Sequence, residues 1–439
     1  MCLFLAMQPI LIVSALLAAA SAADIFADEN LDVIKELEAW KSSHAGKKAV
    51  ESGFVPNVET NGRQEGATSL EAIELERFKA TKAVVEQLNK DYPDAEFSTD
   101  NPFALLTEDE FAQYVMGSFG QDQRKLRTVD HVARELTPEQ REAGDVDWSS
   151  HKCNEPIKNQ GQCGSCWTFS SIGVASFADC LATGSLLDLS QQQLVSCARA
   201  AGQGCQGGWP WKALDYIRET GVCTSSDYPY QSGQSKQDGQ CKQSCNKKKL
   251  QIGETVEIQG ESALQSALDH QAVQVVVEAG NNVWKNYKSG VIRQCPGAQS
   301  DHAVLAVGYG TKDGIQHFKI KNSWGTGWGE GGYMYLQRGG GGKGMCNVAE
   351  HPSYPKLTKA PHPSSDKPMP TSGAPTPTSR GPKPKPSSQR PEPSSQAPSN
   401  KCNGCTGCYY PNQQACQPAF DKGTCDIMTP YYGTVWCGN

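Results

Sequence analysis

Residues 159–181 read NQGQCGSCWTFSSIGVASFADCL, and they decide what the middle of this 439-residue chain can be. The stretch begins with glycine-rich sequence and continues in a pattern typical of an amphipathic helix, so we expect Cys166 at or near a helix N-terminus. At that position the backbone N–H groups and the helix dipole favour thiolate over thiol, and the thiolate is the nucleophilic form. Taken alone, a cysteine beside Trp167 is more often a buried structural thiol or half of a disulfide.

The cysteine count separates these alternatives. Of 18 cysteines, Cys2 lies in the apolar leader, 11 lie between 153 and 346, and six lie between 402 and 437. Cysteines of an exported chain usually form disulfides. Because residues 153–346 contain an odd number of cysteines, one of them is expected to remain outside any disulfide. Cys166 is the candidate because of its helix-terminal position.

A base and an orienting amide follow downstream. His302 opens the alternating segment HAVLAVGYG, which predicts a strand that would hold an imidazole rigidly, and Asn322 follows in IKNSWGTGWG. A lone histidine is more often a satisfied polar residue than a base. Together, a helix-terminal thiol, a strand-borne imidazole and an amide indicate nucleophilic catalysis.

These segments resemble the papain family of cysteine proteases, cathepsin L-like members included, across residues 139–355. The resemblance implies an α+β fold with two lobes, one helical around Cys166 and one a β-barrel-like sheet carrying His302. It also implies hydrolysis of peptide bonds through a thiolate–imidazolium pair and a thioester intermediate. The roles it assigns are nucleophile for Cys166, proton shuttle for His302, orienting amide for Asn322, oxyanion donor for Gln160 and shield for Trp324.

The resemblance further assigns the substrate cleft. Gly207 and Gly208 would pair with the substrate backbone, and an apolar pocket would favour a hydrophobic side chain two residues before the cut. His351 falls at the floor of this pocket, where its protonation would increase tolerance for acidic side chains as pH falls; the alternative is that it points to solvent. The expected pocket residues are Trp209, Pro210, Val276, Ser300, Ala303 and His351.

Disulfides Cys163–Cys205, Cys197–Cys241 and Cys295–Cys346 also follow from the family pattern. Two further bridges are expected among Cys153, Cys180, Cys223 and Cys245, which can pair in three ways. No insertion resembling the cleft-blocking loop of exopeptidase relatives lies between Gly208 and Tyr228. We therefore expect an endopeptidase.

The rest of the chain divides into four parts. Residues 1–22 predict a signal peptide ending in Ala-Ser-Ala, with a membrane anchor as the alternative. Residues 23–138 resemble an inhibitory propeptide. Glu71, Phe78, Val85 and Asn89 match its long-helix motif and Asn101-x-Phe103 follows, whereas Leu75, Thr81 and Leu105 depart from it.

Residues 356–400, with 12 prolines, predict a semi-extended linker. Residues 401–439 predict a small disulfide-rich module.

The module's surplus of aromatic residues suggests a polysaccharide-binding surface, with a protein contact or a protective role as alternatives. Its Cys402, Cys405 and Cys408 spacing could hold a metal, but export favours disulfides. We expect no cofactor, metal, nucleic-acid partner or membrane contact after signal removal, a monomer, and a secreted or vacuolar location. A catalytically silent secreted binding protein acting through the module is the main alternative function, and a transferase using the same thioester is a third.

Overall fold

The computed structural model describes residues 32–56, 70–116, 144–358 and three short strands within 408–437. The predicted signal peptide, the propeptide cleavage region around 130–144 apart from its last residue, nearly all of the linker and the aromatic side chains of the C-terminal module lie outside the described residues. The chain separates into two compact units, Met1–Gly373 and Ala374–Asn439. Within the described part, no helix is long and apolar enough to cross a bilayer.

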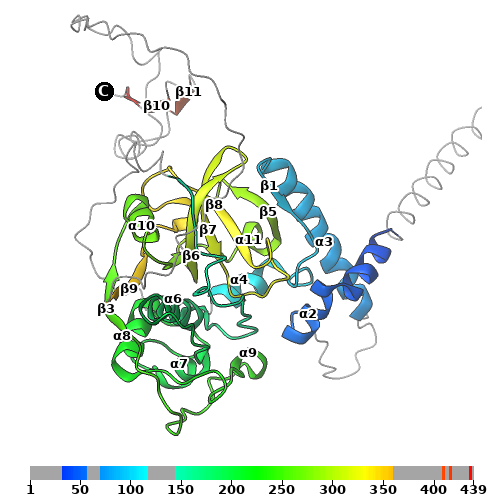
Figure 1. Ribbon diagram of the computed structural model, residues 1–439. Helices are drawn as coiled ribbons and strands as arrows, with labels where there is room; N and C mark the ends of the chain where they lie inside the picture. The colour runs from blue at the N-terminus through cyan, green and yellow to red at the C-terminus, as the bar shows by residue number, and fades with distance from the viewer. Residues whose placement is uncertain are drawn as a thin grey trace, which may run out of the picture. The chain divides into compact units, whose positions relative to one another are not determined.

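The first lobe of the larger unit is helical (Figure 1). It is built on α6 (Cys166–Thr183), with α7 (Gln191–Cys197), α8 (Pro210–Thr220) and the short α9 (Ser232–Ser235) around it. Every residue from Cys166 to Ala182 is buried, so the prediction of an amphipathic α6 was wrong. Helix α6 lies between the other helices and the sheet, and it has no face turned to water.

The second lobe is a mixed sheet in the order β1-β5-β8-β7-β6-β4-β9-β3, with β2 paired to β6. Neighbouring strands run antiparallel except β5 and β8, which are parallel. The long β6 carries buried residues from His302 to Gly310 and packs on α6. The strands are β1 (Ala95–Phe97), β2 (Val146–Asp147), β3 (Ile252–Glu257), β4 (Val273–Val277), β5 (Tyr287–Ile292), β6 (His302–Lys312), β7 (Ile315–Lys321), β8 (Tyr333–Gln337) and β9 (Ser353–Leu357).

Short helices connect these strands. Helix α10 (Glu261–Leu268) precedes β4, and α11 (Asn282–Asn286) precedes β5. The 3-10 turn η1 (Met345–Asn347) lies between β8 and β9. The Asn281 side chain caps α11 by accepting from the N–H of Trp284.

The N-terminal segment, defined here as described residues 32–116, packs against the sheet lobe and contributes its edge strand β1 (Figure 1). It comprises a helix at 32–42, α2 (His44–Ser52), α3 (Leu70–Asp91), β1 and α4 (Glu108–Met116). The predicted long helix is confirmed, and its buried face contains Phe78, Thr81 and Val85, while Leu70 is exposed. Asn89 exchanges hydrogen bonds of 2.9 and 3.0 Å with the backbone of Phe97 and so ties α3 to β1.

Five disulfides lie in residues 153–346, including the three bridges that the family pattern implies. The remaining four cysteines pair as Cys153–Cys180 and Cys223–Cys245. Cys166 forms no disulfide. In the C-terminal unit, β10 (Cys408–Tyr410) pairs with β11 (Ala415–Gln417) and β12 (Val435–Trp436), and Cys437 is disulfide-bonded.

Candidate active site

The thiol of Cys166 stands at the start of α6. Cys166 is the first residue of the helix and Ser165 is the N-cap, whose side chain makes no capping hydrogen bond. The Ala303 N–H lies 3.3 Å from the Cys166 sulfur and donates to it. A helix N-terminus and a backbone donor both favour negative charge on this sulfur, so the position suits a thiolate nucleophile.

The imidazole of His302 is held at the first residue of β6. Its Nε2 lies 2.8 Å from Oδ1 of Asn322, which follows β7 directly and also accepts from the Ser323 N–H at 2.8 Å. Because that amide oxygen can only accept, Nε2 carries the proton in the neutral ring. The other ring nitrogen, Nδ1, has no hydrogen-bond partner among the described residues. Nδ1 is therefore the basic atom.

Two tryptophans enclose this ring. Trp324 stacks on His302 with ring centroids 4.7 Å apart, and Trp284 meets it edge-on at 6.3 Å. His302 is fully buried, and that burial lowers its pKa to about 4, although the hydrogen bond that the ring donates to Asn322 raises it. While the N-terminal segment covers the site, the imidazole is thus held neutral.

Gln160 lies on the loop before α6. Its Oε1 accepts a 2.7 Å hydrogen bond from the Ser323 hydroxyl, and its Nε2 donates to the Cys163 carbonyl at 3.1 Å. Tyr230 fixes the backbone by donating to the Gln160 carbonyl at 2.7 Å. With the amide anchored at both ends, one N–H of its NH₂ group is left for a substrate oxygen.

Comparison with known proteins agrees with this geometry. The family described as "Papain family cysteine protease" matches residues 143–356. The chain is 32% identical to "Probable cysteine protease RD21B" of Arabidopsis thaliana over 393 residues, covering 83% of this chain and 79% of that protein. The chain belongs to the papain family of cysteine proteases. It is a cysteine endopeptidase made as a zymogen. The main functional prediction is therefore confirmed, and the alternative of a catalytically silent binding protein is not supported.

Two further relatives support this assignment. Chymopapain of Carica papaya is 40% identical over 259 residues, covering 58% of this chain and 72% of that protein. The digestive procathepsin L2 proteinase from Tenebrio molitor larval midgut superposes with a TM-score of 0.59 at 27% identity, covering 74% of this chain and 100% of that chain. The likeness to a procathepsin extends over the N-terminal segment, so the two-lobed fold with its propeptide is confirmed.

The thiol of this papain-family protease belongs to an apolar cluster formed by residues that the family pattern assigns to the specificity pocket. Cys166, Trp211, Val276 and Ala303 form one buried cluster with Trp209 packed against it. Val276 and Ala303 are paired across β4 and β6, and Pro210 begins α8. Sequence reasoning missed Trp211, although its place directly after Trp209 and Pro210 was a usable signal.

Polar residues lie next to this apolar cluster. Trp211 and His351 have ring centroids 6.2 Å apart, so His351 lies beside the cluster. The Ser300 hydroxyl donates to Glu350 at 2.7 Å, and Glu350 also pairs with Lys343 at 2.6 Å. Burial lowers the pKa of His351, while the charge of Glu350 opposes that shift and Lys343 adds to it.

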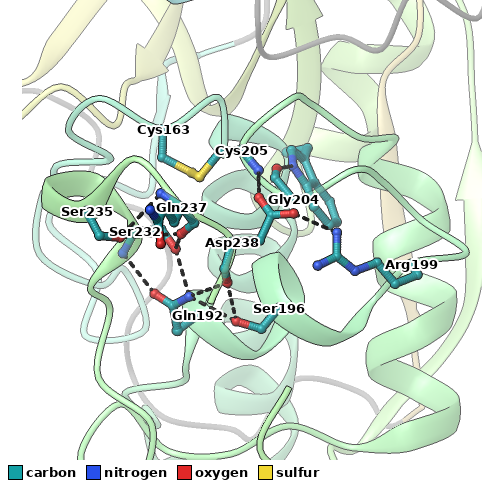
Figure 2. A network of polar contacts seen from close by, with 11 residues as sticks. Cys163, Gln192, Ser196, Arg199, Gly204, Cys205, Ser232, Ser235, Gln237 and Asp238 are labelled. Carbon is teal, nitrogen blue, oxygen red and sulfur yellow. Dashed lines mark hydrogen bonds and ion pairs between the residues drawn. A yellow bond between two sulfur atoms is a disulfide. The ribbon is translucent and has the colours of Figure 1, made fainter. Parts of the chain in front are cut away.

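A polar network that the sequence did not reveal surrounds Asp238, near the Cys163–Cys205 disulfide (Figure 2). Asp238 accepts from the Cys205 N–H and from the Arg199 guanidinium, both at 2.7 Å. Its backbone carbonyl accepts from Gln192 and Ser196. The network therefore anchors the loop around Cys205. The Cys163–Cys205 disulfide ties this loop to the segment before Cys166, and the loop continues into Gly207 and Gly208.

The backbone at Gly208 packs closely against the ring of Trp167. A Cβ at Gly208 would lie 2.5 Å from the Trp167 ring, and Gly207 has a φ of +95°. Any side chain at Gly208 would have to displace Trp167, the residue next to the thiol. The glycines are thus required by space as well as by backbone conformation.

The N-terminal segment covers the catalytic centre. Phe103, Phe111 and Tyr114 all pack against Trp324, with ring centroids 5.3 to 6.2 Å apart. Burial raises the pKa of Tyr114 well above its usual value, and its neighbours Tyr230 and Cys166 contribute to that shift. Helix α4 therefore lies over the thiol and the imidazole, where it keeps substrate out.

Proposed function

We propose that Cys166 is the nucleophile of this endopeptidase, His302 its general base and acid, and Asn322 the residue that orients the imidazole. The observation that carries this assignment is the 2.8 Å contact between His302 Nε2 and Asn322 Oδ1, which leaves Nδ1 as the basic nitrogen. Gln160 and the Cys166 N–H complete the site as oxyanion donors. Trp324, stacked on His302, shields the His302–Asn322 pair from water.

The reaction follows from these positions. When the N-terminal segment has left, the Cys166 proton moves to His302 Nδ1 and gives a thiolate beside an imidazolium. The thiolate attacks the substrate carbonyl carbon, and the oxygen takes negative charge that Gln160 Nε2 and the Cys166 N–H stabilise. The imidazolium then protonates the leaving amine as the C–N bond breaks. Water, deprotonated by His302, hydrolyses the resulting thioester and restores the thiol.

Hydrolysis of a peptide with a hydrophobic residue two positions before the cut tests this assignment. Acid-activated protein at about pH 5 should turn the peptide over, and both Cys166→Ala and an epoxide thiol inhibitor should abolish the activity. A processed, folded protein with no turnover and no labelling of Cys166 would contradict the assignment.

We further propose that His351 broadens the specificity of the pocket with pH. Its imidazole faces Trp211, with Glu350 beside it in the chain. Because burial lowers its pKa, the ring becomes cationic at a lower pH than an ordinary histidine and then attracts an acidic side chain. Substrates with Leu and Glu at this position should show different pH profiles, and His351→Gln should remove the difference. Identical profiles in the wild type would refute the proposal.

The division of the chain is also a proposal. The contacts of residues 32–116 with the catalytic centre support an inhibitory propeptide at 23–138, after a signal peptide at 1–22 and before a catalytic domain at 139–355. A linker would follow at 356–400, with the module at 401–439. N-terminal sequencing of the secreted precursor and of the acid-activated enzyme would test the first two boundaries, and a mature terminus outside about 130–144 would revise the second.

The C-terminal module and the final compartment of the protein are inferred from the sequence. We infer a monomer that is secreted or delivered to a lysosome-like vacuole, and a module that stacks aromatic rings on polysaccharide. Six aromatic residues in so short a cysteine-rich stretch support the module's role. Retention of the isolated module on cellulose, chitin or glucan would support it; passage through all three would point to a protein contact instead.

A further inference from the structure

The N-terminal segment covers a basic strip at the edge of the sheet, which we define as residues 285–293. The strip runs from the end of α11 through β5 and contains Lys285, Lys288 and Arg293 without any acidic residue. One side of β5 pairs with β8 of the catalytic domain, and its other side pairs with β1 of the N-terminal segment. Release of the segment therefore leaves β5 as an edge strand with unsatisfied backbone groups.

The covering stretch is complementary in charge. From Asp91 to Met116 it contains seven acidic residues and no lysine or arginine. Asp94 pairs with Arg293 at 2.7 Å, and Asp100 lies 3.5 Å from Lys288. Each of these two cations therefore loses its partner when the segment is removed.

Backbone pairing accompanies these ion pairs. Ala95 and Glu96 lie opposite Gly290 and Ser289 in an antiparallel register. The Val291 N–H donates to the Asp94 carbonyl at 2.8 Å, and the Ser98 N–H donates to the Asn286 carbonyl at 3.0 Å. The strip thus holds an extended acidic peptide through both its backbone and its charges.

Lys285 places one end of the strip beside the catalytic centre. It is 3% exposed, and its ammonium donates to Thr81 Oγ1 at 3.2 Å and to the Leu106 carbonyl, both in the N-terminal segment. The carboxylates whose charges act on it, Glu108 and Glu110, also belong to the N-terminal segment. Its neighbour Trp284 contacts both His302 and Trp324. The strip is therefore continuous with the wall of the active site.

We propose that in the mature protease this basic strip is an exosite that binds acidic, extended segments of protein substrates by adding them to β5 as a strand. The proposal rests on the proposed function, because it concerns how that endopeptidase holds its substrates. The open edge supplies hydrogen bonds to any polypeptide backbone, and the cations select acidic sequences. An anionic polysaccharide would meet the charges but could not pair with the strand, so a polypeptide is the occupant that fits both.

A labelled peptide with the sequence of residues 92–100, YPDAEFSTD, tests the exosite directly. It should bind mature enzyme whose Cys166 has been blocked by the epoxide, as measured by fluorescence anisotropy, and binding should weaken as salt rises. A peptide with Asn, Gln and Asn in place of the three acidic residues at 94, 96 and 100 should bind about tenfold more weakly. A peptide N-methylated at Ser98, which cannot donate to Asn286, should also bind more weakly.

Enzyme variants supply the matching control. Lys288→Gln combined with Arg293→Gln should weaken peptide binding about five- to tenfold and leave hydrolysis of a short peptide substrate unchanged. Lys356→Gln, which removes an exposed lysine from β9 at the opposite end of the sheet, should change neither. Equal binding of the acidic and amide peptides, or no effect of the double variant, would overturn the proposal.

Two other results would also overturn it. Binding of the peptide to Cys166→Ala enzyme but not to the epoxide-blocked enzyme would place it in the cleft, and a sulfated polysaccharide that competes while N-methylation has no effect would indicate a surface for any polyanion. Failure of the proposed function would appear separately, as absent turnover of the short substrate and no labelling of Cys166. Peptide binding can then still be measured on the unblocked protein.

Discussion

Single hydrogen bonds set the chemistry at the catalytic centre. The Asn322 carbonyl oxygen determines which imidazole nitrogen is basic, and the Ser323 hydroxyl determines how the Gln160 amide faces the cleft. Asn322 and Gln160 were predicted from the sequence, but Ser323 and Tyr230 were not. Their roles depend on contacts across 163 and 70 positions of sequence, which no local pattern reports.

Removal of the Asn322 amide should narrow the pH range of activity. The hydrogen bond that His302 donates to Asn322 raises the pKa of His302, so Asn322→Ala should let the imidazolium lose its proton at lower pH. The alkaline limb of the kcat/KM profile of the mature enzyme should therefore move to lower pH, while the acid limb stays in place. A variant that loses rate evenly at all pH values would show that Asn322 does not tune this proton.

Removal of the Gln160 amide should affect turnover more than labelling. Loss of one oxyanion donor typically lowers kcat by about 10² to 10³, and we expect a fall of this size for Gln160→Ala. Ser323→Ala should lower kcat less, because it frees the amide without removing it. Alkylation of Cys166 by iodoacetamide, which develops no oxyanion, should proceed at the wild-type rate in both variants. Equal losses of labelling and turnover would indicate a damaged site instead.

At the scale of elements, helices α3 and α4 of the N-terminal segment are joined by an ion pair. Leu75 and Leu105 depart from the expected propeptide motif, and Leu105 is fully buried. Arg77 on α3 binds both carboxylate oxygens of Glu110 on α4, at 2.7 and 3.0 Å, and also donates to the Leu105 carbonyl. This ion pair links the two helices.

We expect this ion pair to make release of the segment depend on pH. Burial opposes ionisation of Glu110, but hydrogen bonds from Thr107 and pairing with Arg77 outweigh it and lower the pKa of Glu110. A lowered pKa contributes stability that is present above the ordinary Glu value of about 4.3 and is lost as pH falls through the folded-state pKa. Glu110→Gln should therefore speed activation of the precursor above that pH and converge with wild type in stronger acid.

Asp109→Asn, which changes an adjacent exposed acid, supplies the control for this experiment and should activate like wild type. The rate at which activity appears after transfer to each pH is the measurement. If Glu110→Gln and wild type differ most in strong acid, the assigned direction of the Glu110 effect is wrong.

At the scale of the whole molecule, the precursor has a hydrophobic core that joins the N-terminal segment to the sheet lobe. Trp40, Phe54, Phe78, Phe103 and Phe111 belong to the same buried cluster as Trp284, Trp324 and Trp328, whereas the helical lobe has its own core. Inhibition and folding of the precursor therefore use the same apolar contacts.

Truncation of one ring should loosen this shared core. Phe103 is fully buried and packs 5.3 Å from Trp324, and Phe→Ala in a core typically costs about 3–5 kcal/mol. Phe103→Ala should increase alkylation of Cys166 in the unprocessed precursor, because covering by the segment becomes less stable. Gln113→Ala on the exposed side of α4 should leave alkylation slow. Unchanged protection in Phe103→Ala would mean that α4 holds the site without this ring.

The amino-acid sequence by itself determined the chemistry of this protein: a helix-terminal thiol, a strand-borne imidazole and an amide within recognisable local patterns, because helix termini and strand alternation are set by neighbouring residues. The tertiary structure decided how Cys153, Cys180, Cys223 and Cys245 pair. It also decided the burial of α6, the Asp238 network and the covered basic strip. These features depend on which residues distant in sequence come within a few ångströms, and only packing of the two lobes and the N-terminal segment brings them together.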